Sequence, residues 1–381
     1  MVPVVNPSDF NGMAGELIFV QNAHNNYYAF VPRLLPVQIK FDDEATTLLA
    51  KTSFELGKLE AISSEFPEFA ELQARKEALE SAKLHGNGET LDNIFRYERG
   101  RRSIKDPKAA KEALGHIEAL RSCIPAISRG EISTNTVLKA HKALIGSTNE
   151  NDIIIRNRQN WLGSPDTPAT IARYVPPPPE RVMPLLENTL YYMQEYESIH
   201  PIIQIALMHY QFEAIRPFER ANGRTGRVLI AVYLQKSKLL SLPSLCISEY
   251  FEKDRASYYD TILHVSKTGD YLSWIKFFLK AMHFQAKKAV RTAAKLSEYR
   301  EASMKKLGTS KSSESSRIVL NELFKNPYMT IADARDAIDA TYPTAKRAVD
   351  MLVKEGILAP EKKERNMGFF ADKIYEIINE E

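Results

Sequence analysis

A polar loop between two helical segments constrains this chain more than any other stretch of its sequence. Residues 209–215 indicate the end of one helix and residues 228–239 indicate the next, and the loop between them is rich in arginine. We expect the second helix to open at Asn222, so that its first backbone N–H groups have no partner within the helix. Such groups and the helix dipole favour anions. Gly223 and Gly226 would let a ligand approach the backbone, and the pattern therefore predicts a phosphate-binding loop.

The order of residues in this loop resembles the signature of the Fic (fido) family, His-Pro-Phe-x-Asp/Glu-Gly-Asn-Gly-Arg-x-x-Arg. Six residues match it at the same spacing: Pro217, Phe218, Asn222, Gly223, Arg224 and Arg227. The resemblance implies a mainly helical Fic-type bundle with a β-hairpin flap, and a loop that binds the phosphates of ATP. Enzymes of that family usually move AMP onto a hydroxyl of a target protein, so it also implies an adenylyltransferase. On this basis nucleotide binding is assigned to Ala221, Asn222, Gly223, Arg224, Thr225, Gly226 and Arg227.

Three positions depart from the signature. Arg216 stands where the family has its catalytic histidine, Arg220 where it has the carboxylate that binds Mg²⁺, and Ala221 where it usually has glycine. A guanidinium keeps its proton at any physiological pH, so Arg216 cannot act as a general base. Arg220 would repel Mg²⁺, and the two added charges could hold ATP or another anion without a metal. If Ala221 needs a positive φ, alanine costs about 1 kcal/mol there relative to glycine.

These departures leave three hypotheses for function. In the first, the chain binds a nucleotide or a similar anion and transfers AMP weakly or not at all. In the second, it is an active adenylyltransferase or another phosphotransferase with a substitute base, for which His85, His209 and Glu219 are the candidates. In the third, it regulates transcription through a C-terminal domain. Losing a general base typically costs a factor of about 10² to 10⁴ in rate, and we rank the first hypothesis highest.

A regulatory helix is predicted near the N-terminus. Residues 67–86 indicate a helix that ends in Ser81-Ala-Lys-Leu-His85-Gly86, which is similar to the inhibitory helix of Fic proteins. In that family a glutamate precedes the glycine and pairs with the last arginine of the signature, here Arg227. His85 takes its place, and an imidazole cannot form an arginine–carboxylate pair. The resemblance makes Ser81, His85 and Gly86 regulatory residues with an altered inhibitory contact.

Two further stretches extend the resemblance through the expected Fic domain, residues 101–306. Residues 152–162 begin with a β-branched run that breaks the helical period, which predicts a hairpin. It resembles the flap with which Fic proteins hold a target protein by strand addition. Residues 247–259 resemble the stretch that completes the adenine pocket, and Tyr258 is our candidate contact there. Trp161 is predicted to be a packing anchor.

The predicted N-terminal region, residues 1–100, is expected to begin without regular structure. Prolines punctuate residues 1–40 and indicate an irregular segment. Helices are predicted over residues 42–65, 67–84, 90–101, 107–128, 134–144, 180–196 and from 270 to about 305.

A run of small polar residues, 307–316, predicts a linker and a domain boundary. Beyond it, residues 317–381 predict helices over 317–325, 330–340 and 341–355 and a β wing formed by residues 356–358 and 367–370. This order resembles a winged helix-turn-helix domain, a common tail of Fic proteins. Acidic residues slightly outnumber basic ones from Lys311 onward, so a partner protein or a homodimer is at least as well supported as DNA.

The composition limits the classes of protein to which the chain can belong but does not indicate a function. The chain has 381 residues, enough for two or more domains, and its net charge of +3 does not indicate nucleic acid or membrane binding. Two cysteines, Cys123 and Cys246, make no metal cluster and are expected to be buried. No signal peptide or apolar span of membrane length is found, so we expect a cytoplasmic protein without membrane contact, whose partners are a nucleotide and a target protein.

Overall fold

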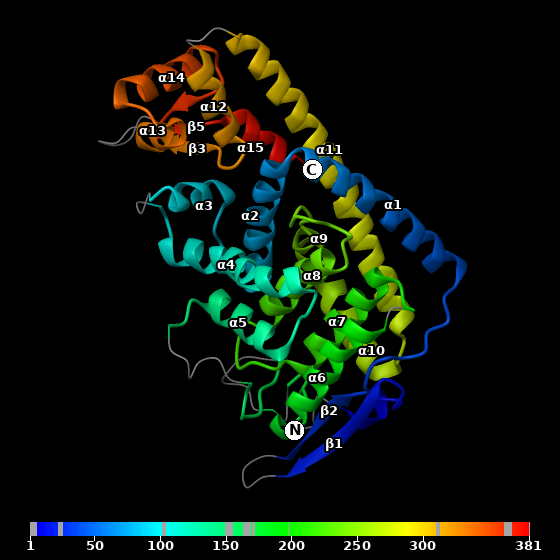
Figure 1. Cartoon of the computed structure of the whole chain (residues 1–381). Coiled ribbons are helices and arrows are strands. Elements are labelled where there is room, and N and C mark those ends of the chain that lie inside the picture. Colours follow the sequence, from blue (N-terminus) through cyan, green and yellow to red (C-terminus); the bar gives the residue numbers. More distant parts are fainter. Residues whose placement is uncertain are drawn as a thin grey trace. The chain divides into compact units, whose positions relative to one another are not determined.

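The computed structural model is mainly helical and divides into two compact units (Figure 1). It describes residues 6–21, 26–100, 104–148, 155–162, 169, 172–196, 198–309, 313–361 and 368–380. The first unit comprises Met1–Phe54, Gly115–Leu239 and Ile247–Phe284, and the second comprises Glu55–Leu114, Leu240–Cys246 and Gln285–Glu381. This grouping differs from the expected domain limits, which follow the order of the chain and stay a prediction.

The first unit begins with a β hairpin. β1 (Gly15–Gln21) pairs antiparallel with β2 (Asn26–Pro32), and both strands pack in an apolar cluster that includes Val175 and Trp161. The expectation that residues 1–40 are irregular is therefore wrong. The described prolines that suggested it lie outside the strands or at a strand end, where proline is tolerated. The role of Trp161 as a packing residue is confirmed.

α7 (Pro201–Ile215) forms the centre of the first unit. Every residue from Ile202 to Ile215 is buried, and a helix that is apolar on all sides is typical of a protein core. α7 packs against β2 and against α6 (Pro179–Glu195), α8 (Asn222–Lys236) and α10 (Arg255–Thr268), while α5 (Thr134–Ile145) packs against α6 and α8. The loop between α7 and α8 is thus held at the junction of buried helices.

The other helices of residues 6–309 agree with the sequence pattern in most of their limits. They are α1 (Asp43–Glu65), α2 (Pro67–Lys83), α3 (Leu91–Glu98), α4 (Pro107–Arg129) and α11 (Tyr271–Leu307). The sequence did not predict α9 (Ser248–Lys253) or a short 3-10 helix at Pro7–Asp9. α3 ends before the expected limit, and residue 101 lies outside the described residues. Both cysteines are buried, as predicted. In the described part of the chain, each helix is too short or too polar to span a lipid bilayer.

The C-terminal part of the second unit combines three helices with a small sheet. The helices α12 (Glu314–Leu323), α13 (Ile331–Ile338) and α14 (Tyr342–Lys354) pack against one another. The antiparallel sheet has the order β3 (Tyr328–Thr330), β5 (Gly368–Phe370), β4 (Ala359–Pro360), and α15 (Asp372–Asn379) follows it. The three predicted helices are present, although the sequence did not predict β3 or α15. The first wing strand lies at 359–360 rather than 356–358, and the winged-helix assignment stays a prediction.

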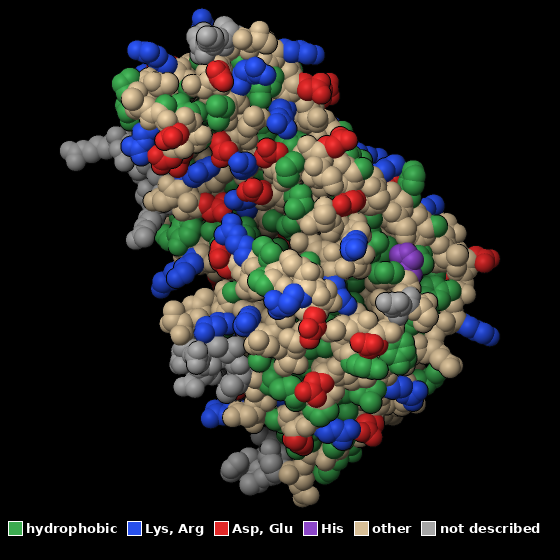
Figure 2. Space-filling view, in the orientation of Figure 1, with side chains coloured by type: hydrophobic (Ala, Val, Ile, Leu, Met, Phe, Trp, Pro, Cys, Tyr) green, Lys and Arg blue, Asp and Glu red, His purple; other side chains and the backbone are tan. Residues whose placement is uncertain are grey.

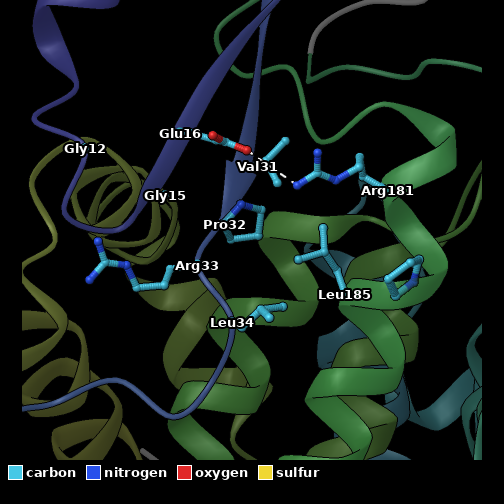
Figure 3. Close-up of a pocket in the computed structure, with 10 residues that line it drawn as sticks. Gly12, Gly15, Glu16, Val31, Pro32, Arg33, Leu34, Arg181 and Leu185 are labelled. Carbon is cyan, nitrogen blue, oxygen red and sulfur yellow. Dashed lines mark hydrogen bonds and ion pairs between the residues drawn. The ribbon is translucent and has the colours of Figure 1, made fainter.

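A cavity of about 420 Å³ lies between the hairpin and α6 (Figure 3). Glu16 on β1 and Arg181 on α6 form an ion pair of 3.4 Å beside it, with side chains 63% and 48% exposed. An ion pair this exposed contributes little to stability. No lining residue of this cavity belongs to the loop between α7 and α8.

A substitution at Gly115 on α4 tests how closely α4 packs on α5. A Cβ atom at Gly115 would lie 2.3 Å from the carbonyl oxygen of Leu144 on α5, and backbone cannot yield without moving the helix. We expect Gly115→Ala to lower the free energy of unfolding by about 2 kcal/mol, because overpacking outweighs the gain in helix propensity. The control is Gly57→Ala on α1, where nothing lies within 4 Å. It should stabilise, and a rise in the calorimetric melting temperature of both variants would contradict the close packing.

Candidate functional site: a loop and helix N-terminus for an anion

The loop between α7 and α8 turns through two residues in the left-handed region. Arg216 ends α7 with a φ of 48°, and its N–H donates to the Phe212 carbonyl at 3.0 Å. Ala221 precedes α8 with a φ of 58°. This position therefore has the positive φ at which alanine is less favourable than glycine. Each of these side chains costs about 1 kcal/mol relative to glycine. The surroundings must therefore compensate for two strained positions.

The side chain of Asn222 forms two hydrogen bonds within the loop. Its side-chain oxygen accepts the Phe218 N–H at 2.8 Å, and its amide group donates to the Phe218 carbonyl at 2.7 Å. Asn160 donates to the same carbonyl at 3.0 Å. The side chain that the sequence assigned to a nucleotide is thus engaged inside the loop. What Asn222 offers a ligand is its backbone N–H at the start of α8.

A buried arginine from outside the loop satisfies the carbonyl groups at its start. Arg156 is 2% exposed, and its guanidinium donates to the carbonyl oxygens of Arg216 at 2.8 Å and Ile215 at 3.3 Å, and also to those of Pro177 and Arg158. Burial lowers its pKa to about 10. Hydrogen bonds from a charged donor are roughly twice as strong as neutral ones. Sequence reasoning missed this residue, because one arginine after a β-branched run forms no recognisable pattern.

His141 on α5 fixes the aromatic residue of the loop. Its ring stacks on Phe218 at a centroid distance of 3.7 Å, and its Nδ1 lies 2.9 Å from the Thr225 hydroxyl. That hydroxyl donates to the Ala221 carbonyl at 3.0 Å, so Nδ1 is the donor to it and carries the proton. Burial lowers the pKa of His141 to about 4, with contributions from nearby arginines. Thr225, also assigned to the nucleotide, therefore has a structural partner.

Two buried arginines make the start of α8 strongly positive. Arg224 and Arg227 are 9% and 1% exposed. Burial and then the charges of Arg227 and Arg224 lower the pKa of His116 on α4 to about 3. Guanidinium groups at a helix N-terminus favour a phosphate or a similar anion. Gly226 faces α7 instead, where a Cβ atom would lie 3.2 Å from Phe212 Cδ1, so its lack of a side chain serves helix packing rather than ligand approach.

Arg216 pairs with a buried carboxylate of α7. Its Nη1 lies 3.7 Å from Oε2 of Glu213, whose side chain is 5% exposed. Burial raises the pKa of Glu213, whereas the charges of Arg216 and Arg227 act in the opposite direction. Arg220 and Glu219 are exposed. Within the described ranges no three His, Cys, Asp or Glu side chains are grouped to bind a metal ion, and with a cation at Arg220 the loop does not fit Mg²⁺.

A cavity of about 310 Å³ adjoins the Arg216–Glu213 pair. Most of its wall is apolar, as in typical small-ligand pockets. Glu213 and Tyr259 also interact electrostatically with Arg227 of α8, which ties the cavity to the positive start of that helix. Its lining residues are Leu162, Arg173, Tyr174, Glu213, Tyr259, Ile262, Leu263 and Ser266.

Tyr258, the expected adenine contact, does not line this cavity. It has no exposed surface, and its hydroxyl lies 2.8 Å from Nε2 of the equally buried His209. Tyr258 is therefore a core residue, and His209 has the structural role expected for it. The neighbouring Tyr259 lines the cavity instead. Paired tyrosines on a helix point to different sides, and the sequence did not reveal which side faces a ligand.

In its described part, the expected hairpin at residues 152–162 contains one isolated β-bridge and no strand. Residues 155–161 form no strand, and Leu162 bridges to Tyr174. Residues 152–154 lie outside the described residues. The hydrogen bonds of Arg156 attach this segment to the loop, and strand addition by a target protein stays a prediction.

The regulatory assignment of residues 81–86 also stays a prediction. Ser81 is buried on α2, whereas His85 is exposed in the turn that follows the helix. Gly86 has a φ of 87°, as suits glycine beyond a helix end.

Family models match two long stretches of this chain. Residues 131–234 match the Fic/DOC family, and residues 46–124 match the Fic/DOC family N-terminal region. These two stretches belong to the Fic/DOC family, so the chain carries a Fic domain and its N-terminal region. Protein adenylyltransferase fic-1 of Caenorhabditis elegans is 28% identical over 182 residues, and protein adenylyltransferase Fic of Nematostella vectensis is 29% identical over 170 residues. The matches cover 46% and 44% of this chain but only 33% and 36% of those proteins.

Solved structures share the fold at low sequence identity. A Fic family protein from Desulfovibrio desulfuricans superposes with a TM-score of 0.59 at 16% identity, covering 88% of this chain and 98% of that chain. Fic-1 from Caenorhabditis elegans gives a TM-score of 0.50 at 18% identity, covering 67% and 73%. The expected fold class, a mainly helical Fic-type bundle, is confirmed.

Three buried histidines of the first unit predict a loss of stability in acid. Burial lowers the pKa values of His116, His141 and His209 from 6.5 to about 3, 4 and 3. Between these values and pH 6.5 the unfolded chain binds more protons than the folded chain. The free energy of unfolding therefore decreases as the pH is lowered, by up to about 1.4 kcal/mol per pH unit for each histidine. The melting temperature should drop between pH 7 and pH 5.

Single substitutions separate these histidines from other titrating groups. His141→Asn should make the acid-induced drop in melting temperature smaller. The control is His264→Asn, because the side chain of His264 is 51% exposed, and this variant should keep the full drop. Equal drops in the parent protein and both variants would contradict the role of the buried imidazole.

Proposed function

We propose that this protein binds ATP, or an anion of the same kind, at the start of α8 and transfers AMP weakly or not at all. The main support is the grouping of the first backbone N–H groups of α8 with Arg224 and Arg227. Helix N-termini with arginine are suited to phosphates. A largely apolar cavity of about 310 Å³, lined by Glu213 near the end of α7, has the character that suits a nucleobase. Relatives are protein adenylyltransferases, which makes ATP the first nucleotide to test.

The step of a transfer reaction that this site supports least is removal of the proton from the attacking hydroxyl. In AMP transfer a target hydroxyl oxygen bonds to the α-phosphorus, pyrophosphate leaves, and a base takes the hydroxyl proton. Arg216 cannot accept it. The absence of this base lowers the rate by a factor of about 10² to 10⁴. Arg220 carries a positive charge where the family has a metal-binding carboxylate. We therefore infer that ATP binding depends little on Mg²⁺.

Reversion of the two loop arginines tests the proposal. Transfer of label from ATP labelled at the α-phosphate should be weak or absent for the parent protein and strong for the double variant Arg216→His, Arg220→Asp, with a cell lysate as the source of targets. The restored imidazole and carboxylate supply the base and the metal ligand. Adding Arg224→Ala to the double variant is the control and should abolish the label, because it removes a phosphate-binding cation.

Two results would contradict this reading. Labelling of a target by the parent protein as strong as that by the double variant would mean that a substitute base acts, as in an active adenylyltransferase or another phosphotransferase. Failure of the parent protein to bind ATP in calorimetry would remove the nucleotide-binding proposal itself.

We propose as a second candidate that the C-terminal segment, which we interpret as a winged-helix domain, contacts protein and supports a homodimer. On the face shown in Figure 2, basic and acidic side chains are interspersed over this part of the chain. Lys346 on α14 pairs with Asp350 at 2.6 Å, which offsets part of the basic character that DNA would need. Tyr342, at the start of α14, is 55% exposed, and exposed aromatic side chains are common in protein contacts.

Sedimentation of the full chain distinguishes these partners. We expect a dimer that Tyr342→Glu converts to a monomer, because a charge replaces the aromatic contact. The control is Lys346→Glu on the same helix, which should alter the dimer less. A monomeric parent protein, or retention on DNA that falls steeply with salt, would reject the protein contact in favour of a DNA-linked role in transcription.

A further inference from the structure

β1 is an outer strand with one unpaired edge. No residue of β1 is buried, whereas five of the seven residues of its partner β2 are buried. Phe19, in the middle of β1, is 52% exposed. In the described part of the chain no third strand pairs with this hairpin. The edge of β1 that faces away from β2 is therefore accessible to another chain.

The hydrogen bonds of the hairpin show which backbone groups lie on that edge. The Arg33 N–H donates to the Ala14 carbonyl at 2.7 Å, across the hairpin. The Phe30 N–H points away from β1 and donates to the Val175 carbonyl at 2.8 Å. Because such bonds alternate along an antiparallel pair, and the register has no bulge, every second residue of β1 directs its N–H and C=O groups outward. Among the described residues no partner is found for the outward groups of these residues, which are Gly15, Leu17, Phe19 and Gln21.

The sequence of β1 lacks the features that usually protect an exposed edge. Proteins protect such edges with lysine, proline, a bulge or a covering segment, because unpaired N–H and C=O groups can pair with another strand. Glu16 is the one charged residue of this strand, and its other members are mostly apolar. Apolar and β-branched residues favour extended structure. Such an edge favours the addition of an extended segment from another chain.

The cavity of about 420 Å³ lies at the start of this edge (Figure 3). Gly15, the first of the four edge residues, lines it together with buried apolar side chains. These buried lining residues are Val31, Pro32 and Leu185. A cavity with such a lining takes an apolar side chain, because burial of apolar surface is favourable.

Two exposed arginines line the same cavity, Arg33 after β2 and Arg181 on α6 (Figure 3). Within the described ranges the Arg33 guanidinium has no ion pair. Arg181 has the exposed pair with Glu16 at 3.4 Å, which contributes little and can be exchanged for another partner. Two arginines against one glutamate leave an excess of positive charge at the cavity. This charge is complementary to a carboxylate on a bound segment.

We propose that β1 binds an extended segment of a partner protein as a third, antiparallel strand. In this direction the C-terminal end of the segment lies beside Gly15 and the cavity. The segment carries an apolar side chain that enters the cavity and, two residues later on the same face, an acidic side chain that pairs with Arg33 and Arg181. Backbone pairing supplies affinity, and the cavity supplies specificity. The inference does not depend on the proposed function, because no residue of the loop before α8 lines this cavity.

The charge requirement is tested with a defined probe. The probe is a short fluorescent peptide amide of alternating Thr and Val that ends in Leu-Thr-Glu, and its matched partner ends in Leu-Thr-Gln. In fluorescence anisotropy the full chain should bind the first peptide about 5-fold more tightly, the range of an exposed ion pair. Arg33→Gln should remove most of this preference. The control, Arg121→Gln at a 59% exposed side chain of α4, should keep it.

N-methylation of the peptide tests strand pairing itself. In an added strand every second N–H of the peptide faces β1, and the others face solvent. N-methyl groups on one alternate set of residues should therefore abolish binding, and the same number on the other set should leave it. Equal effects of the two sets would overturn strand addition.

Two substitutions at Phe19 separate its backbone from its side chain. Phe19→Pro removes one outward N–H group, a change tolerated on the solvent side of an edge strand, and should weaken peptide binding about 10-fold. Phe19→Thr keeps the N–H group and should bind nearly as tightly as the parent protein. Melting temperatures verify that both variants are folded.

Two results would overturn the proposal for this edge. One is a parent protein that binds neither peptide. The other is a dimer, detected by sedimentation, that Phe19→Pro dissociates and that the peptide does not, because the edge would then pair with a second copy of this chain.

Discussion

The candidate site depends on how the carbonyl groups of a strained loop are satisfied. Buried helices enclose the start of this loop, and a buried carbonyl without a donor is costly. The guanidinium of Arg156 supplies donors to the end of α7, and the amide groups of Asn160 and Asn222 supply them to Phe218. These contacts come from the segment before α6, from the loop and from α8. They hold two left-handed residues in place before α8, whose first N–H groups have no partner within the helix.

Positive charge is concentrated around this loop, and it explains several properties together. Burial and then the charges of Arg227 and Arg224 lower the pKa of His116, so its imidazole is neutral. Glu213 offsets the charge of Arg216. In the proposed function, arginine at the position of the base favours binding of a nucleotide over its transfer.

Family membership and chemistry are carried by different residues. The fold follows from the apolar α7 and from the helices that pack on it, and such a core tolerates many sequences. Relatives at 16% to 18% identity therefore share the architecture. The resemblance to the family signature assigns the reaction to single side chains in the loop, and Arg216 and Arg220 stand at two of those positions. A shared fold does not imply shared activity.

The sequence by itself determined most helix limits, the loop before α8 and its departures from the family signature, because helical periodicity and loop spacing are local. It did not determine the N-terminal hairpin, since strand pairing joins segments through contacts that composition does not show. It also misplaced Tyr258 and missed Arg156, His141 and Glu213. Which side of a helix faces a cavity, and which distant donor reaches a buried carbonyl, are decided by packing between segments far apart in the chain. Only the tertiary structure brings those groups together.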